Sequence, residues 1–368
     1  MITDDVAHAI ALNAVCPYFT MFPLNFPVRI LRSQAKKNEH VLDPFCGRGT
    51  TNFAARLLGL RSLGIDSSPV AAAITAAKIA SATPDEIVEE AAAIITSTPS
   101  RTRPRGEFWQ RAYHASVMDK LCRLRSGLLQ DCSTDARRAL RGIILGALHG
   151  PRTKGLPSYF SNQCTRTYAP KPRYATNFWR SRKLAPPKVD VLGVIRRRAE
   201  RYYLGNLPRG LGEVHLGDSR DEQSFSASTH GEFTWIITSP PYYGMRTYIP
   251  DQWLRNWFLG GPDVVSYSAE GQLVHSSPKD YVSELRQVWQ NSAKVCRDGA
   301  RLVIRFGGIS DRRADPLDLV KQSLKESDWT VETIRQAGLA SKGKRQADSF
   351  LRERSSPMME YDVWARLV

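Results

Sequence analysis

Residues 40–66 read HVLDPFCGRGTTNFAARLLGLRSLGID, and the pattern of this stretch decides the fold class. An apolar run that ends at Asp43 predicts a short buried strand, and the glycines of the GRG sequence predict a turn after it. The apolar residues of 50–58 recur at helical spacing, and a second strand is expected over 62–66. Strand, turn, helix and strand in this order are typical of a parallel sheet flanked by helices.

The same alternation resumes only far downstream, with a helix expected at about 279–296. Five further strands are predicted at 214–216, 233–238, 301–305, 329–334 and 361–367. Between Asp66 and Asp218 lie about 150 residues, where an α/β fold needs only one crossover helix. We therefore expect an insertion.

Three parts of the chain follow from this reading. Residues 1–82 hold the first part of the α/β domain, and 213–368 hold its second part. The inserted segment, 83–212, is expected to be helical at first, since Thr83 and Pro84 are typical of a helix start. Its later part is basic and rich in proline, and we treat it as a candidate target-recognition region.

The net charge of the chain is strongly positive and unevenly distributed. Lys and Arg number 52 and Asp and Glu 36, which gives +16 among 368 residues. Residues 151–210 hold 14 of the basic residues and two acids, so 14 − 2 = +12 of that surplus lies there. A concentrated surplus favours a binding surface for an anionic partner, most often nucleic acid, over general solubility.

Within this region the basic segment (residues 151–189) contains six prolines, with aromatic and basic residues interleaved. Cations suit phosphates and rings suit unstacked bases, so this composition is typical of a nucleic-acid groove. The alternative is a solvated linker, although linkers are poor in aromatic residues. The candidate nucleic-acid-binding residues are Arg166, Lys171, Arg173, Tyr174, Trp179 and Arg180.

The six cysteines are scattered, with no CxxC pair and no histidine at metal-ligand spacing. They predict free thiols in a reducing compartment and no metal site. The first residues lack the profile of a signal peptide, and no apolar run is long enough to span a bilayer. We therefore expect a cytoplasmic protein without a membrane segment.

Polar residues gather where the predicted strands end. The glycine turn (residues 43–51, DPFCGRGTT) follows the first strand, and glycines allow a close backbone approach to a ligand. Asn52 stands where a dinucleotide-binding motif has its third glycine, which argues against a pyrophosphate. Asp66 is placed to accept hydrogen bonds from ribose hydroxyls, and Asp218 to receive an exocyclic amine. Taken singly, the turn and both carboxylates are also typical of purely structural turns and helix caps.

A second motif, the SPPY loop (residues 238–242, TSPPY), follows the apolar strand at 233–238. Two consecutive prolines lack N–H donors and leave carbonyl oxygens as acceptors. Ser239 adds a hydroxyl, and Tyr242 adds a ring on which a planar group can stack. The loop suits a flat molecule that bears an amino group, such as a nucleobase, although alone it could be only a proline-rich turn.

Taken together, the two motifs resemble those of the S-adenosylmethionine-dependent amino-methyltransferases of DNA, the N4-cytosine and N6-adenine enzymes. The serine of SPPY looks like the N4-cytosine branch, since the adenine branch more often has Asp or Asn there. Residues 18–23 resemble the N-terminal cofactor-contacting motif of the family, and 248–260 its aromatic helix after the catalytic loop. The resemblance implies a Rossmann-like class I methyltransferase fold, with a mostly parallel seven-stranded sheet flanked by helices.

By the same resemblance the cofactor is S-adenosylmethionine, and catalysis belongs to Ser239, Pro240, Pro241 and Tyr242. The residues expected to bind the cofactor are Thr20, Phe22, Pro23, Asp43, Pro44, Phe45, Cys46, Gly47, Gly49, Thr50, Thr51, Asp66, Ser67, Asp218, Ser219 and Thr238.

The expected activity is transfer of a methyl group to the N4 amine of cytosine in double-stranded DNA, by in-line attack from a flipped base. A restriction-modification or related host-defence setting is expected, with a cognate restriction endonuclease as a possible partner. Many N4-cytosine enzymes carry SPPY before the glycine motif, whereas this chain has the opposite order, which RNA amino-methyltransferases can share. N6-adenine methylation, RNA methylation and an inactive nucleic-acid-binding relative therefore stay open as alternatives.

Overall fold

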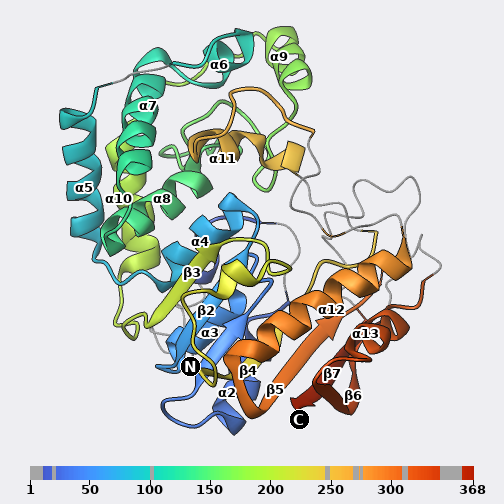
Figure 1. The fold of residues 1–368 in the computed structure, drawn as a ribbon. Coiled ribbons are helices and arrows are strands. Elements are labelled where there is room, and N and C mark those ends of the chain that lie inside the picture. Colours follow the sequence, from blue (N-terminus) through green and yellow to red (C-terminus); the bar gives the residue numbers. More distant parts are fainter. Residues whose placement is uncertain are drawn as a thin grey trace. The chain divides into compact units, whose positions relative to one another are not determined.

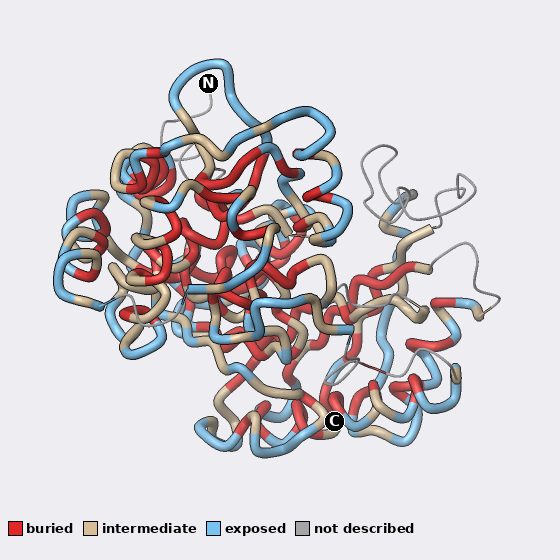
Figure 2. Tube along the Cα trace, turned by 90° about the horizontal axis from the view of Figure 1, so that it is seen from above, coloured by how far each residue is buried: buried red, intermediate tan, exposed pale blue. Residues whose placement is uncertain are grey.

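The computed structural model describes residues 11–18, 22–99, 103–244, 249–267, 273, 277–308, 314–339 and 359–368 (Figure 1). The chain forms two compact units. The helical unit comprises residues 1–18, 76–209 and 248–269, and the sheet unit comprises 19–75, 210–247 and 270–368. Figure 2 colours the buried positions of the described chain red.

The sheet unit is built on a seven-stranded sheet in the order β3-β2-β1-β4-β5-β7-β6. The strands are β1 (His40–Asp43), β2 (Arg61–Asp66), β3 (Gly212–Leu216), β4 (Phe233–Thr238), β5 (Cys296–Phe306), β6 (Trp329–Leu339) and β7 (Met359–Leu367). All pairs from β3 to β5 are parallel, and β7 is antiparallel to both of its neighbours. This arrangement confirms the expected Rossmann-like class I fold with a mostly parallel sheet.

Helices cover both faces of the sheet. They are α2 (Asn25–Gln34), α3 (Thr50–Leu57), α12 (Pro278–Val295) and α13 (Pro316–Leu324), with a short 3-10 helix η1 (Glu222–Phe225) and with α4 (Pro69–Ile79) leading into the helical unit. In β1, Val41 packs with α2 and α3, while Leu42 packs with α12 and α13 on the other face. This alternation follows from the two-residue period of a strand, and it explains why these strands are almost continuously apolar.

The local sequence explains where the covering helices begin. Helix α12 starts at Pro278 because the Ser277 hydroxyl caps it, accepting a hydrogen bond from the Asp280 backbone N–H at 3.3 Å. Helix α13 starts at Pro316 in the same way, with the Asp315 carboxylate as its cap. Both helices carry proline at the first position, where no N–H donor is needed.

The helical unit contains most of the inserted segment. Its helices are α5 (Pro84–Ser97), α6 (Glu107–Ala112), α7 (Ala115–Gln130), α8 (Asp135–Ala147), α9 (Pro172–Ser181), α10 (Val191–Tyr203) and α11 (Trp253–Phe258), with a 3-10 turn η2 (Ile249–Gln252). Helix α5 packs against α7, α8 and α10, and α6 packs against α9 (Figure 1). A capping box between Thr83 and Glu86 starts α5, as the sequence suggested.

Residues after the SPPY loop also belong to the helical unit. The Trp109 ring lies 4.6 Å from that of Trp257, and Phe108 lies 4.8 Å from Trp253. Arg255 is fully buried and donates to the carbonyls of three residues, Leu145, Arg166 and Thr167. Through these contacts α11 packs against the inserted segment, and no local sequence pattern predicted this packing.

Within the described residues, no helix has both the length and the hydropathy needed to cross a membrane. The six cysteines are unpaired.

Candidate functional site

The switch in strand order lies between β1 and β4, and it brings the two predicted motifs together. Asp43 ends β1 and Thr238 ends β4, and these strands are parallel neighbours. The Thr238 hydroxyl donates to Asp43 Oδ1 at 2.6 Å, and both side chains are buried. Ligands of open parallel sheets bind at the carboxyl ends of strands beside such a switch point. The sheet therefore joins the glycine turn and the SPPY loop at the edge where a ligand is expected.

The glycine turn needs its two glycines for different reasons. Gly47 has φ +52° and Gly49 φ +71°, a region that side chains disfavour. A Cβ on Gly49 would lie 2.5 Å from the Thr75 side chain, so this glycine permits close packing against α4. A Cβ on Gly47 would meet only the Phe45 carbonyl, at 3.9 Å. Gly47 therefore leaves an open backbone surface that a ligand can approach.

Asp66 ends β2 beside this turn. Its carboxylate accepts hydrogen bonds from the backbone N–H of Gly47 and of Ser68, each at 2.8 Å. The side chain is half-buried, and Ser67 next to it is exposed. Each carboxylate oxygen has a second lone pair, so Asp66 can still accept hydrogen bonds from hydroxyl groups. The open face of Gly47 and this acceptor fit the ribose part of S-adenosylmethionine.

Burial changes the ionisation of both carboxyls at this edge. It raises the pKa of Asp43 to about 6, against the opposing effect of hydrogen bonds from the Thr238 hydroxyl and the Phe45 backbone N–H. It also raises the pKa of Asp66 to about 6, against the hydrogen bonds from Ser68 and Gly47. A raised carboxyl pKa means that the folded protein takes up protons as the pH falls from about 7 to about 5, where the same carboxyls in the unfolded chain are still mostly ionised.

We expect cofactor affinity to fall as the pH drops through 6. Hydroxyl donors favour the ionised Asp66, so protonation of the free protein competes with binding, and the affinity for S-adenosylmethionine should be about tenfold lower at pH 5 than at pH 7.5. Titration calorimetry at a series of pH values measures this. The Asp66→Asn variant should bind weakly and without this pH dependence; an unchanged pH profile in that variant would assign the titration to another group, Asp43 being the first candidate.

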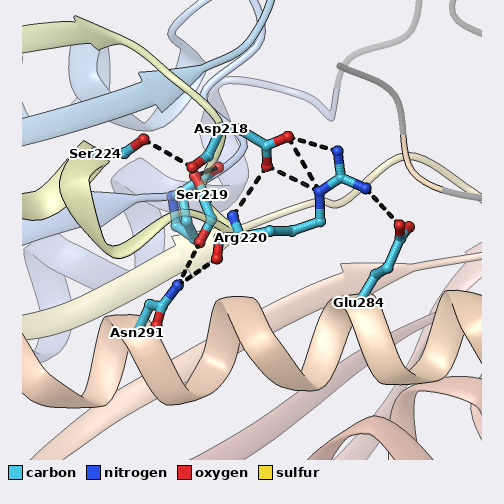
Figure 3. Close-up of polar contacts among 7 residues, drawn as sticks. Asp218, Ser219, Arg220, Ser224, Glu284 and Asn291 are labelled. Atoms are coloured by element: carbon cyan, nitrogen blue, oxygen red, sulfur yellow. Dashed lines mark hydrogen bonds and ion pairs between the residues drawn. The ribbon is translucent and has the colours of Figure 1, made fainter. Parts of the chain in front are cut away.

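The loop after β3 holds an ion-pair network (Figure 3). Arg220 Nε and Nη2 donate to the Asp218 carboxylate at 3.0 Å and 2.5 Å, and Nη1 donates to Glu284 of α12. Burial raises the pKa of Asp218, but the hydrogen bonds from Arg220 outweigh it and hold the pKa below its usual value. An amino group at Asp218 would therefore share the carboxylate with a guanidinium that the sequence did not single out.

The same loop is tied to the glycine turn. The Ser219 hydroxyl donates to the Pro44 carbonyl at 2.6 Å. Asn291 of α12 donates from its amide to the carbonyls of Ser219 and Arg220, at 3.1 Å and 2.9 Å (Figure 3). The ends of β1 and β3 are therefore connected through residues that the sequence assigned to cofactor binding.

Other residues of the glycine turn serve the scaffold. The Thr51 hydroxyl is buried and donates to the Ile237 carbonyl at 2.9 Å, which holds α3 to β4. Cys46 and Thr50 are buried as well. The Phe45 ring is half-buried and packs edge-on against Trp289 of α12, at 6.1 Å. These side chains therefore hold the turn in place by packing and hydrogen bonding within the sheet unit.

The N-terminal motif lies before α2, and Thr20 falls outside the described residues. Phe22 is half-buried and Pro23 is exposed. The Phe22 ring packs edge-on against Phe26 at 5.4 Å. Phe26 in turn lies 3.6 Å beneath the guanidinium of Arg305, so the sheet supports the position of this motif.

In the SPPY loop, Ser239 is half-buried, Pro240 is buried, and Tyr242 is half-buried at the end of the motif. The Tyr281 hydroxyl of α12 donates to the Pro241 carbonyl at 2.5 Å. Because the Pro241 carbonyl already has a partner within the protein, the hydroxyl of Ser239 and the carbonyl of Pro240 are the better candidates for contacting a substrate.

The basic segment is folded, with α9 at its centre. This helix is amphipathic: Ala175, Thr176 and Trp179 are buried, while Arg173 and Tyr174 are exposed. Tyr174 is 68% exposed and the Trp179 side chain 0% exposed, so only the first can meet a base in this conformation. The Trp179 indole donates to the Gln163 carbonyl at 3.0 Å. The expectation that Trp179 contacts nucleic acid does not agree with its burial, because its ring packs in the core of the helical unit.

The cations of the segment differ in how they are engaged. Arg166, Lys171 and Arg173 are exposed and form no ion pair with described residues. Arg180, by contrast, pairs with Glu107 of α6 at 2.5 Å. Tyr267 is 68% exposed, and its ring lies 5.5 Å from the Lys171 ammonium. This tyrosine was not predicted, because it is distant from the basic segment in sequence.

Within the described ranges, no group of three or more His, Cys, Asp or Glu side chains is arranged to hold a metal ion.

Comparison with known proteins gives matches to the N-terminal part of the chain, which contains the glycine turn and Asp66. Residues 8–77 match the model of the N6/N4 methyltransferase family, described as DNA methylase. The type II methyltransferase M2.LlaDCHI of Lactococcus lactis subsp. cremoris is 49% identical over 39 residues, which are 11% of this chain and 14% of the relative. The matched segment is therefore a small part of that relative's length.

Solved structures align over nearly the whole chain at low similarity. An S-adenosylmethionine-dependent methyltransferase from Methanosarcina mazei is 8% identical, with 95% of this chain and 99% of that one covered and a TM-score of 0.36. The rRNA methyltransferase aviRa from Streptomyces viridochromogenes is 13% identical, with 100% and 93% covered and a TM-score of 0.35. Because these TM-scores are low, the fold assignment depends on the strand order of the sheet and not on these similarities.

The family match includes the glycine turn and Asp66, the part of the site whose geometry suits the cofactor. This part of the chain is similar to the DNA amino-methyltransferases of the N6/N4 family.

Proposed function

We propose that this protein is a DNA methyltransferase that transfers a methyl group from S-adenosylmethionine to the N4 amine of cytosine. The observation that carries the proposal is the hydrogen bond between Thr238 and Asp43, which joins the SPPY loop to the glycine turn at the switch point of the sheet. A nucleobase-binding loop and a cofactor-binding turn thereby share one edge.

When bound, S-adenosylmethionine supplies an electrophilic methyl group. The chain's own contribution is to hold the amine that attacks it. An exocyclic amine of a nucleobase is a poor nucleophile because its lone pair is delocalised into the ring. Hydrogen bonds from the amino group to the Ser239 hydroxyl and the Pro240 carbonyl would localise that lone pair. The amine would displace the thioether form of the cofactor as the leaving group, and the methylated nitrogen, cationic at first, would lose its proton to solvent. Catalysis would then come from alignment and electrostatics, with no strong base required.

A base paired within duplex DNA cannot reach a site at the end of a sheet, so the target base would be flipped and stacked on Tyr242. The ring is half-buried, which suits a surface that is covered only when the base arrives. The exposed cations Arg166, Lys171 and Arg173, with the rings of Tyr174 and Tyr267, would bind the phosphates and unstacked bases of the DNA.

The preference for cytosine depends on Ser239, because the adenine branch of the family more often has a carboxylate or amide at that position. N6-adenine is the second candidate, since the two bases present similar amino groups. We further propose a restriction-modification setting with a cognate endonuclease, which the similarity to a type II methyltransferase supports. We also propose a cytoplasmic location.

We expect methylated DNA to contain N4-methylcytosine. The experiment incubates the protein with isotopically labelled S-adenosylmethionine and mixed-sequence DNA, digests the DNA to nucleosides, and identifies the labelled product by mass spectrometry. An equal mass of RNA is the parallel substrate. Label found only in N6-methyladenine would contradict the choice of base, and label found only in RNA would contradict the choice of nucleic acid.

A further inference from the structure

The Tyr242 side chain is held by groups outside the SPPY loop. Its hydroxyl donates to Glu360 Oε1 of β7 at 2.8 Å. Its ring packs edge-on against Phe306 at the end of β5, with centroids 5.2 Å apart and an interplanar angle of 68°. One contact fixes the tip of the side chain and the other fixes its ring plane.

The residue after β5 is a glycine, and it lies against both Tyr242 and Glu360. A Cβ on Gly307 would lie 3.0 Å from Glu360 Cγ and 3.3 Å from Tyr242 Cε2. Both distances are tighter than ordinary van der Waals contact, so a larger residue would push at both partners. Gly307 therefore allows the tyrosine and the glutamate to pack closely together.

The loop backbone is held separately, from α12. Tyr281 is fully buried and donates to the Pro241 carbonyl, and its ring lies 5.4 Å from that of Tyr243. The backbone at Pro241 and the side chain of Tyr242 are thus fixed by different elements of the sheet unit. Loss of Glu360 would free the tip of the Tyr242 side chain without releasing the loop.

We propose that Glu360 is a positioning residue that presents the Tyr242 ring to the target base. The inference rests on the proposed function, in which that ring stacks on the flipped base. Stacking uses the face of the ring and has no need of the hydroxyl. The hydroxyl serves to anchor the ring before the base arrives, so that binding does not have to order it.

A double-mutant cycle tests this directly. Tyr242→Phe and Glu360→Ala each remove one side of the hydrogen bond and should each raise KM for DNA about tenfold, with little change in kcat. The double variant should be no worse than either single variant, since all three lack the same bond. Glu360→Gln keeps an acceptor oxygen and should recover most of the wild-type KM.

The matched control is Glu332→Ala, which removes a half-exposed glutamate that pairs with Arg366 within the same sheet. It should leave KM and kcat at wild-type values. Affinity for S-adenosylmethionine should be unchanged in every variant, and circular dichroism checks that each is folded. If Glu360→Ala does not fold, Tyr242→Phe and Glu360→Gln still give opposite expected results, a loss and a near recovery.

A wild-type KM in Glu360→Ala, or effects that add in the double variant, would overturn the inference. Absence of methylation by the wild-type protein on any DNA would instead overturn the proposed function. In that case the same cycle, read by thermal unfolding, still tests the anchoring, because a shared hydrogen bond makes the two destabilisations non-additive. Additive shifts in melting temperature would then reject it.

Discussion

Replacing Tyr242 or Ser239 with alanine is expected to abolish most methyl transfer while leaving the cofactor bound. Tyr242→Ala removes the stacking ring, and Ser239→Ala removes an acceptor for the amine. Loss of one preorganised group at a reacting centre typically costs about 100-fold or more in turnover, and loss of a stacking ring adds weaker base binding. Single-turnover methylation assays measure the loss, and calorimetry with S-adenosylmethionine measures the retained affinity.

The control for this pair is Ser226→Ala, an exposed serine between β3 and β4 that lies outside the predicted site. It should methylate at the wild-type rate. If Ser239→Ala also stays at the wild-type rate, the serine is no acceptor, and the argument for cytosine loses its foundation. If cofactor affinity collapses together with turnover, the SPPY loop acts on the cofactor and not on the base.

The second large effect is expected on DNA binding. Arg166, Lys171 and Arg173 are exposed and free of ion pairs with described residues, so each can neutralise one phosphate. Changing all three to alanine should lower DNA affinity at least tenfold and reduce the slope of log affinity against log salt by about 3, because fewer counterions are released. Fluorescence anisotropy over a salt series measures both quantities.

A charge-matched control is available at the opposite ends of the strands. Lys36 and Lys37 precede β1 and Arg61 begins β2, and all three are exposed. Their replacement removes the same charge from the edge where no ligand is expected, so the salt slope should stay near its wild-type value. Equal losses in the two triple variants would mean that total charge attracts the DNA and that the basic segment has no special role.

Local pattern was sufficient for much of the sheet unit. The apolar runs before Asp43 and Asp66 gave β1 and β2, and the strand before the SPPY loop gave β4, because buried parallel strands are short and continuously apolar. Proline and an N-cap residue marked the start of α5. The glycine turn could be recognised because Gly47 and Gly49 adopt positive φ, which few other residues tolerate.

The supporting residues of the site could not be predicted in the same way. Arg220 meets Glu284, and Tyr242 meets Glu360, across 64 and 118 residues of sequence. Glu284 lies on an amphipathic helix, and Glu360 lies near the start of a strand. The local sequence around such a glutamate is the same whether its side chain faces water or a partner. The partner is set by tertiary packing, which a single sequence does not encode in any local period.

The basic segment shows the same division at the level of single side chains. The sequence by itself determined that cations and rings are concentrated over residues 151–189, since composition needs no coordinates. Only the tertiary structure decided which of them face solvent: α9 turns Tyr174 outward and buries Trp179. The physical reason is that a helix offers one face to the core, and an indole that can both fill space and donate its N–H to the Gln163 carbonyl is more stable buried than exposed.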